Sequence, residues 1–259
     1  MTADLLDLAR RAAVAAGDRL LERFGGPASG LDSKTSRTDL VSDADRESEE
    51  LILAMLRAER PDDGIVAEEG GSGEDRSGVT WVVDPLDGTI NFLWGLPQWS
   101  VTLACRDRDG LLVGVVHDPS RRETFWASRG GGAYLNGGRL ALDGGPPLEE
   151  ALVGTGFSYR AQERALQAAR VTRMIAAVRD IRRFGSAAID LAWVAAGRLD
   201  AYYETSLSPW DWAGGSLLVT EAGGGVVDLP PHGGFSAGLL AARPSLVQPM
   251  LSLIGAAVP

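Results

Sequence analysis

The chain has 259 residues, 45% of them hydrophobic, and a formal net charge of -10. A chain of this length can bury one substantial core, and its acidic balance provides no global positive field to attract nucleic acid or an anionic membrane surface. Cys105 is the single cysteine, which excludes an intrachain disulfide and a thiolate metal cage and is typical of a reducing compartment.

The N-terminal residues give no sign of a secretory signal, because they include two aspartates and lack a cationic segment followed by an apolar block. No uninterrupted apolar stretch of the sequence approaches the roughly 18 to 20 residues needed to cross a bilayer. We therefore expect a cytoplasmic protein that does not span a membrane.

Two helices are predicted at the start of the chain. Apolar residues recur at helical spacing over residues 3–24, and a glycine pair follows them, which predicts the first helix. Ser42 and Asp45, three residues apart, form a capping-box-like start for the second helix. This second helix is expected to end before Pro61.

Strands are predicted next along the chain. Short runs of β-branched and aromatic residues are bounded by Gly, Pro and Asp, which is typical of strands in a largely antiparallel sheet. The predicted strands are 64–67, 79–83, 99–104, 111–116 and 123–127. The glycine-rich stretch 130–138 is predicted to be a loop.

The C-terminal part predicts a second set of strands and helices. Strands are expected at 152–155, 200–204, 226–227 and 238–242, and helices at 162–178, 186–196, 210–221 and 244–257. Gly197 is expected to end its helix in the left-handed conformation. Strands and helices in both halves favour a layered α+β architecture. We expect one unit over 1–259, with subdomains at about 1–145 and about 146–259.

The most informative segment is 81–92, in which an apolar strand runs directly into two aspartates. Asp84 stands at the strand end. Pro85 favours a tight turn, so that Asp87 can face the same point, and Gly88 allows a close backbone approach. Hard divalent cations prefer such carboxylate oxygens. The same pattern is also ordinary turn chemistry that can simply connect two elements.

Three further acidic segments favour the cation site. Glu68 and Glu69 end another apolar strand, Asp211 begins a helix, and Asp45 lies in an acidic helix entrance. Each has a plain structural alternative as a surface residue, a helix-dipole partner or a cap. Together they favour bound cations, because clustered carboxylates repel one another and because an acidic protein needs cations to accept a phosphate anion.

Other phosphate-handling chemistries are disfavoured by the sequence. His117 and His232 are the two histidines, and neither has a partner at ligand spacing, which argues against zinc and against a phosphohistidine. The Gly-Lys-Ser/Thr string of a P-loop is absent. The carboxylates therefore remain the candidates for the chemistry.

These motifs resemble the signatures of the inositol monophosphatase family. The resemblance covers nearly the whole chain in the family's order, and it implies a layered α-β-α-β-α sandwich, a homodimer and a magnesium-dependent phosphomonoesterase. The matching segments are Lys34, Asp39-Leu-Val-x-x-x-Asp45, Glu68-Glu69, Asp84-Pro-Leu-Asp-Gly-Thr-x-Asn-Phe92, Asp200-Ala-Tyr-Tyr-Glu204, Trp210-Asp-x-Ala-Gly214 and Thr220-Glu-Ala-Gly-Gly224.

The resemblance implies a ligand set for two to three Mg²⁺ ions. Glu68, Asp84 and the Leu86 carbonyl would hold one ion. Asp84, Asp87 and Asp211 would hold a second, and Glu68 would also reach a third, weaker site. The ions would neutralise the phosphate and activate water, so that direct hydrolysis needs no phosphoenzyme.

Catalytic roles also follow from the resemblance. Thr89 and Asp45 would orient and deprotonate the attacking water, with Glu68 assisting, and the amides of Gly88 and Thr89 would hold the phosphate. Lys34 looks like a supporting residue, as does Asp39 of the same motif.

The substrate is the least specified part of the resemblance. Glu204 and Ala187 match positions that touch the inositol ring, and Asp211 is expected to contact the substrate as well. A small phosphate ester, inositol monophosphate or a similar polyol phosphate, is therefore favoured, without nucleic acid or membrane as partner. Histidinol phosphate, fructose 1,6-bisphosphate and adenosine 3',5'-bisphosphate remain alternatives, as does a non-catalytic regulatory binding protein on this fold.

Overall fold

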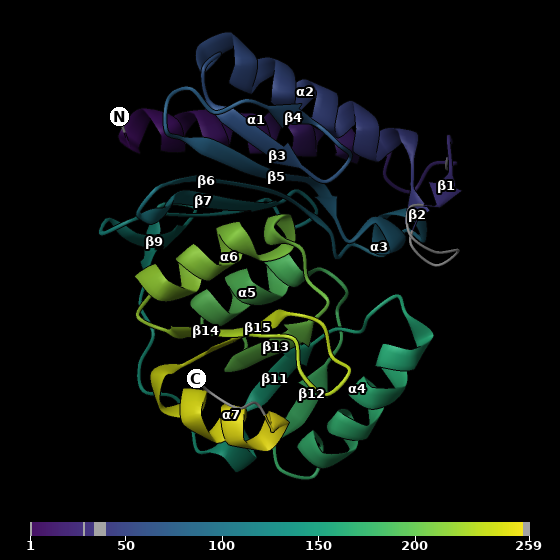
Figure 1. The fold of residues 1–259 in the computed structure, drawn as a ribbon, viewed down its shortest axis with the longest axis vertical. Coiled ribbons are helices and arrows are strands. Elements are labelled where there is room, and N and C mark those ends of the chain that lie inside the picture. Colours follow the sequence, from purple (N-terminus) through teal and green to yellow (C-terminus); the bar gives the residue numbers. More distant parts are fainter. Residues whose placement is uncertain (1, 28, 34–39, 256–259) are drawn as a thin grey trace.

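The computed structural model describes residues 2–27, 29–33 and 40–255 of the chain. In these residues two large sheets alternate with helical layers along the longest axis of the molecule (Figure 1). One pair of helices covers the outer face of the first sheet, a second pair lies between the sheets, and a third covers the outer face of the second sheet. The predicted α+β sandwich is confirmed.

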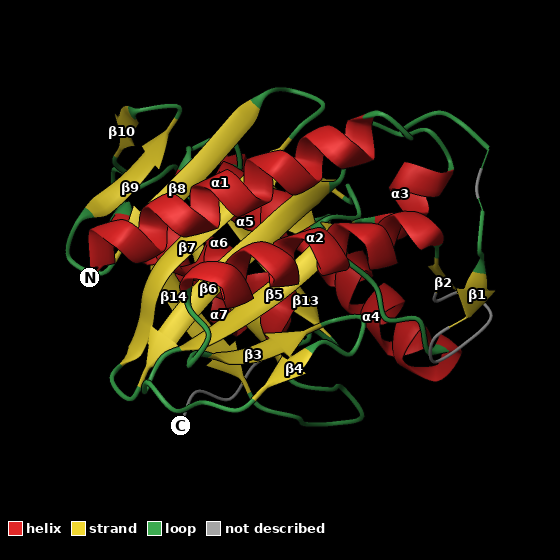
Figure 2. Ribbon diagram, turned by 90° about the horizontal axis from the view of Figure 1, so that it is seen from above, coloured by secondary structure: helices red, strands yellow, loops and turns green. Residues whose placement is uncertain are grey.

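The N-terminal helices lie side by side across the first sheet (Figure 2). They are α1 (Thr2–Leu21), whose buried face is rich in alanine, and α2 (Asp43–Glu59). The predicted capping box begins α2, because the Ser42 amide donates a hydrogen bond to Asp45 Oδ2 at 2.9 Å. Both predicted helices are confirmed, although the first ends about one turn earlier than expected.

Two short strands pair in the connection between these helices. They are β1 (Asp32–Ser33) and β2 (Leu40–Val41), and they run antiparallel. Lys34 and Asp39, which the family resemblance assigns to supporting positions, lie outside the described residues.

The first sheet has eight strands in the order β10-β9-β8-β7-β6-β5-β3-β4. All neighbouring pairs are antiparallel except β3 and β5, which are parallel, so the prediction of a largely antiparallel sheet is confirmed. The strands are β3 (Gly64–Ala67), β4 (Ser72–Gly73), β5 (Thr80–Asp87), β6 (Ser100–Asp107), β7 (Gly110–Asp118), β8 (Glu123–Ser128), β9 (Gly132–Leu135) and β10 (Gly138–Leu140).

The prediction of a loop over 130–138 is wrong, because this stretch contains β9 and the start of β10. Phe125 pairs with Leu135 and Trp126 with Tyr134, so the apolar residues between the glycines extend the sheet. The glycines adopt left-handed conformations at the turns that flank the new strands, at Gly130, Gly132 and Gly137. The glycines therefore predicted the turns correctly, but they led to a wrong prediction for the short strand between them.

The second sheet has five strands in the order β12-β11-β13-β15-β14. The pairs of β11 with β12 and β13 are parallel, and the other two pairs are antiparallel. The strands are β11 (Leu152–Thr155), β12 (Asp180–Arg182), β13 (Ala201–Thr205), β14 (Gly225–Leu229) and β15 (Gly238–Ala242).

Four longer helices and two short 3-10 turns complete the C-terminal part. They are η1 (Leu148–Glu150), α4 (Ala161–Met174), α5 (Ala187–Ala195), α6 (Pro209–Glu221), η2 (Pro244–Leu246) and α7 (Val247–Ile254). None of the helices within residues 2–27, 29–33 and 40–255 combines the length and the apolar character that a bilayer span requires.

The C-terminal helices show one confirmed end and two corrections. Gly197 follows α5 with φ +71°, as predicted. The helix predicted over 162–178 ends at Met174, because the Arg179 amide then bonds to the Ala151 carbonyl and the chain enters β12 beside β11. The last helix begins with η2 and ends at Ile254, where Gly255 adopts a left-handed conformation. Residue 257, its predicted end, lies outside the described residues.

The middle layer approaches the first sheet through glycines. A Cβ atom on Gly114 of β7 would lie 2.6 Å from the Gly214 carbonyl oxygen of α6. Backbone meets backbone at this point, so a side chain can be accommodated only if a whole element shifts. This close approach fixes the distance of α6 from the sheet, and α6 carries one of the candidate site residues.

Gly114→Ala is expected to lower the free energy of unfolding by about 1–3 kcal/mol, because it overpacks this contact. Urea unfolding measures the change. Gly144→Ala is the matched control, since a Cβ there meets no atom within 4 Å, and it should stay within about 0.5 kcal/mol of the parent. Equal effects of the two substitutions would contradict the close-approach explanation.

Candidate active site

The end of β5 presents two carboxylates on an irregular turn. The register between β5 and β6 shifts between Asp84 and Asp87, which places an extra stretch of chain between the two side chains. Asp84 Oδ1 accepts a hydrogen bond from the Leu86 amide at 3.0 Å. Ser48 of α2 donates to the Pro85 carbonyl at 2.8 Å, so the turn is anchored to the outer helical layer.

The turn continues through Gly88 into the short helix α3 (Thr89–Leu93). Gly88 has φ +91°, and a Cβ there would lie 2.9 Å from the Gln98 carbonyl oxygen. Both the left-handed backbone and the close approach require glycine at this position. The turn therefore holds its amides beside the two aspartates in one fixed conformation.

Asp87 connects the first sheet to the beginning of α5. Its Oδ2 accepts hydrogen bonds from Ser186 Oγ at 2.6 Å and from the Ala188 amide at 2.8 Å. The carboxylate thus satisfies donors at the N-terminus of α5, where negative charge is favoured. Ala187, a predicted substrate contact, is the first residue of that helix. The contact of Ser186 was not predicted, although Gly-Ser-Ala-Ala is a recognisable N-cap pattern.

Thr89 and Asp45 form a pair between α3 and α2. Thr89 Oγ1 lies 2.8 Å from Asp45 Oδ1 and 3.1 Å from the Leu86 carbonyl oxygen, so its single proton serves one of these acceptors at a time. Asp45 is fully buried, and its other oxygen accepts from Ser42. A hydroxyl of this kind can receive a proton while passing its own to the buried carboxylate.

Glu68 and Glu69 follow β3, and α2 holds the loop they begin. Glu49 of α2 accepts hydrogen bonds from the amides of Glu69 at 2.8 Å and Gly71 at 3.0 Å. Glu49 was not predicted as a site residue. Glu49 is 6% exposed. A charged residue on the apolar face of a predicted amphipathic helix is the sequence feature that could have identified it.

The C-terminal part contributes Asp211 and Glu204. Asp211 lies in the first turn of α6, where Ser208 begins the helix with a capping box and donates its amide proton to Asp211 Oδ2 at 2.6 Å. Glu204 lies near the end of β13 and accepts a hydrogen bond from the Tyr202 hydroxyl. Tyr202 was not predicted as a site residue, because its alternation in the strand marks it simply as core.

These segments enclose a cavity of about 920 Å³. Asp45 does not line the cavity itself but is hydrogen-bonded to Thr89, which does. The other predicted site residues all line the cavity. The lining includes Glu68, Asp84, Leu86, Asp87, Gly88, Thr89, Ala187, Glu204 and Asp211.

The cavity is unfavourable for ionised carboxylates. Burial, followed by the charge of Glu68, raises the pKa of Asp84 and of Asp211 well above the usual range. Burial also raises the pKa of Asp87 to about 6 and that of Glu204 to about 7. The ionised forms of all four groups are therefore disfavoured, most strongly those of Asp84 and Asp211, and a nearby cation would stabilise them.

The donor chemistry of the cavity suits a hard divalent cation. Within the described part of the chain, no three Asp, Glu, His or Cys side chains are grouped closely enough to hold an ion. Arg160 and Arg183 also line the cavity, but the raised pKa values of Asp84 and Asp211 show that these oxygen donors would be stabilised by further positive charge. Oxygen donors of this kind fit magnesium.

Comparison with known proteins identifies the family over nearly the whole chain. The model of the inositol monophosphatase family matches residues 1–251. The chain belongs to the inositol monophosphatase family. Nus factor SuhB of Pasteurella multocida is 41% identical over 257 residues, covering 96% of this chain and 95% of the relative.

Solved structures of similar proteins share the fold. The extragenic suppressor protein suhB of Bartonella henselae superposes with a TM-score of 0.89 at 33% identity, covering 98% of this chain and all of that one. An IMPase of Thermotoga maritima gives a TM-score of 0.87 at 33% identity, covering 97% of each chain.

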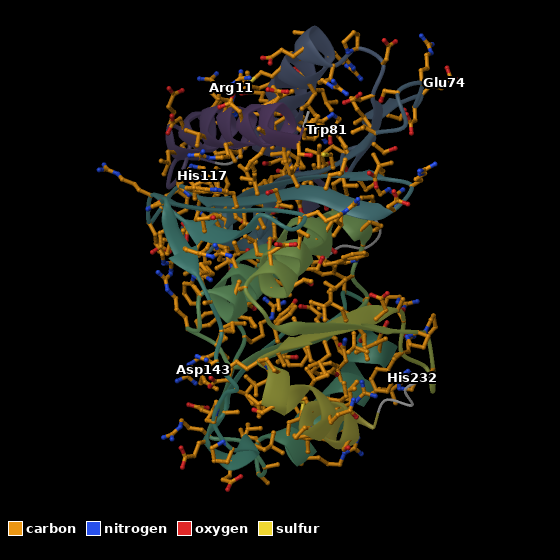
Figure 3. The ribbon with its side chains drawn as sticks, turned by 90° about the vertical axis from the view of Figure 1, so that its left-hand side faces the viewer. Arg11, Glu74, Trp81, His117, Asp143 and His232 are labelled. Atoms are coloured by element: carbon orange, nitrogen blue, oxygen red, sulfur yellow. The ribbon has the colours of Figure 1, made fainter. Side chains whose placement is uncertain are left out.

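Neither His117 nor His232 is among the residues that line the cavity. His117 is in the part of the molecule formed by the first sheet, and His232 is in the opposite part (Figure 3). His117 contacts Thr124, and His232 contacts Arg170, so both are engaged in local packing.

Proposed function

We propose that this chain hydrolyses phosphate monoesters of inositol or of a similar polyol, with Mg²⁺ held by the acids of the cavity. The observation that carries the proposal is the concentration of buried carboxylates with raised pKa values around one cavity. Burying several acids together is costly unless positive charge offsets them. Membership of the inositol monophosphatase family supports the same activity.

The proposed ligands are Glu68, Asp84, Asp87, Asp211 and the Leu86 carbonyl. Bound magnesium would supply neutralisation of the phosphoryl oxygens and a lowered pKa of water. The chain itself orients these donors: Ser186 and Ala188 hold Asp87, Ser208 holds Asp211, and the Leu86 amide holds Asp84.

Thr89 and Asp45 are proposed to move the proton of the attacking water. Thr89 Oγ1 takes that proton while its own proton passes to Asp45 Oδ1, 2.8 Å away. Asp45 is buried and bonded to Ser42, so its orientation is fixed before substrate arrives. The amides of Gly88 and Thr89 are suited to hold the phosphate, and Ala187 lies in the same cavity as a contact for the polyol.

Glu204 is proposed to form a hydrogen bond with a hydroxyl group of the polyol. Burial holds its pKa at about 7, and the Tyr202 hydroxyl fixes one of its oxygens. A carboxyl group in this position can accept a hydrogen bond when ionised or donate one when protonated. This property suits a polyhydroxylated alcohol.

The test is magnesium-dependent phosphate release from inositol 1-phosphate, histidinol phosphate, fructose 1,6-bisphosphate and adenosine 3',5'-bisphosphate. The highest kcat/KM is expected for inositol 1-phosphate. Another substrate of the panel in first place would retain the chemistry and replace the substrate. The absence of phosphate release from all four substrates would favour a non-catalytic binding protein. The relatives' name, Nus factor, also supports this second candidate.

A further inference from the structure

Helix α4 buries a polar face that the proposed chemistry does not use. Glu163, Gln167 and Arg170 follow one another at helical spacing and are 2%, 1% and 3% exposed. A helix of a layered protein normally turns apolar residues toward the core. Buried polar groups are costly unless hydrogen bonds satisfy them, so the partners of this face reveal what it holds in place.

Glu163 joins segments that are far apart in the sequence. Its Oε1 accepts hydrogen bonds from the Ser236 amide at 2.9 Å and from Thr205 Oγ1 at 3.3 Å. Its Oε2 forms an ion pair with Arg160 and accepts from Ser236 Oγ at 3.2 Å. Arg160 also donates to Ser236 Oγ, which closes a ring of contacts around the carboxylate.

Gln167, one turn further along α4, extends the same network. Its Oε1 accepts from the Ser158 amide at 2.9 Å, and its Nε2 donates to Thr205 Oγ1 at 3.0 Å. Thr205, which is itself fully buried, is therefore held by both α4 side chains.

The segments held by α4 form one wall of the 920 Å³ cavity. Ser158, Arg160 and Ser236 line it directly, and Thr205 precedes the lining residues Ser206 to Ser208. This wall comes from the loops of the second sheet, whereas Glu68, Asp84 and Asp87 come from the first. The cavity is near the upper end of the roughly 300–1,000 Å³ typical of ligand sites, which leaves room for the alcohol part of an ester beside the acids.

Glu163 is ionised within this network of hydrogen bonds. Burial alone would raise its pKa, but the Ser236 amide and the Arg160 guanidinium, among its partners, lower the pKa to about 2. The carboxylate is thus ionised throughout the neutral range. Hydrogen bonds to a charged group are stronger than neutral ones, so they fix the wall more firmly.

We propose that Glu163 is a positioning residue for substrate selection, holding the Arg160 and Ser236 wall against the alcohol part of the phosphate ester, with Gln167 as support. This inference rests on the proposed phosphatase function. It assigns the preferred substrates to esters of bulky cyclic polyols or sugars that reach the wall, over esters of small acyclic alcohols that do not.

The test compares steady-state kinetics on inositol 1-phosphate and on glycerol 2-phosphate, a small acyclic ester. Glu163→Ala is expected to raise KM for inositol 1-phosphate about tenfold, the equivalent of one lost hydrogen bond to a charged group. Its kcat should stay within a factor of about two, and the constants for glycerol 2-phosphate should not change, because the proposed metal ligands are untouched.

Glu163→Gln is expected to give a smaller rise in KM, since it keeps one acceptor oxygen for the Ser236 amide. Gln167→Ala should act in the same direction as Glu163→Ala. Gln162→Ala is the matched control, because Gln162 lies on the exposed face of the same helix, and it should match the parent. If Glu163→Ala does not fold, Glu163→Gln carries the comparison.

The outcomes separate the two proposals. A parent protein that is active, with unchanged KM values in the Glu163 variants, overturns the positioning role alone. So does an equal loss on both esters, which would mean general loosening of the site. A parent protein without activity on any ester overturns the proposed function and, with it, this inference.

Discussion

Asp84→Asn is expected to lower kcat/KM for magnesium-dependent phosphate release by about 10²–10³-fold, a loss typical of removing one charge-stabilising group from an active site. Asp84 is 1% exposed at the end of β5, and it is the side chain proposed to serve two ions. Asn has the same shape and keeps an oxygen that can accept the Leu86 amide. The loss therefore reports the missing charge, and not a missing contact.

Asp190→Asn is the matched control for this experiment. Asp190 is also 1% exposed, and burial raises its pKa well above the usual range, so the substitution makes the same chemical change at a comparable depth. It lies on α5 and is not one of the residues that line the cavity. Its kcat/KM should stay within about threefold of the parent. Similar losses in both variants would contradict a specific role for Asp84.

The second large effect concerns stability without divalent cations. In the presence of a chelator, the free energy of unfolding is expected to fall by a few kcal/mol as pH rises from about 5 to about 8. The pKa of Asp87 is raised to about 6 and that of Glu204 to about 7, whereas both are near 4 in an unfolded chain. Between these values the folded state keeps protons that the unfolded state has released, so rising pH favours unfolding.

One group acts in the opposite direction. Burial lowers the pKa of His117, so the folded state binds fewer protons there and loses stability as pH falls below about 6.5. A single histidine opposes several raised carboxylates, and the net slope should follow the carboxylates.

Urea unfolding at several pH values, with chelator or with saturating magnesium, measures this effect. Magnesium should stabilise the folded protein more at pH 8 than at pH 5, because protons compete for the same oxygens at low pH. In chelator at pH 8, Asp84→Asn should be more stable than the parent, since it removes a buried charge. Stability that rises with pH in chelator would refute the proposed origin of the slope.

Local patterns in the sequence predicted the two N-terminal helices, the glycine that ends α5 and most strands of both sheets. Helical spacing and the capping box at Ser42 depend on residues three or four apart, so the chain itself contains the whole signal. The acidic segments at Asp84, Glu68 and Asp211 were also visible, because a carboxylate after an apolar strand stands out without any knowledge of its neighbours.

Partners from distant parts of the chain could be identified only in the folded structure. Ser186 and Asp87 are 99 residues apart, and Glu163 reaches Ser236 across 73 residues. The strand β9 exists because Tyr134 and Leu135 find β8 as a neighbour, although the glycines around them favour a loop. These contacts depend on which groups distant elements bring close together in the folded chain. The free energy of strand pairing and burial then exceeds the local conformational preference of a few residues.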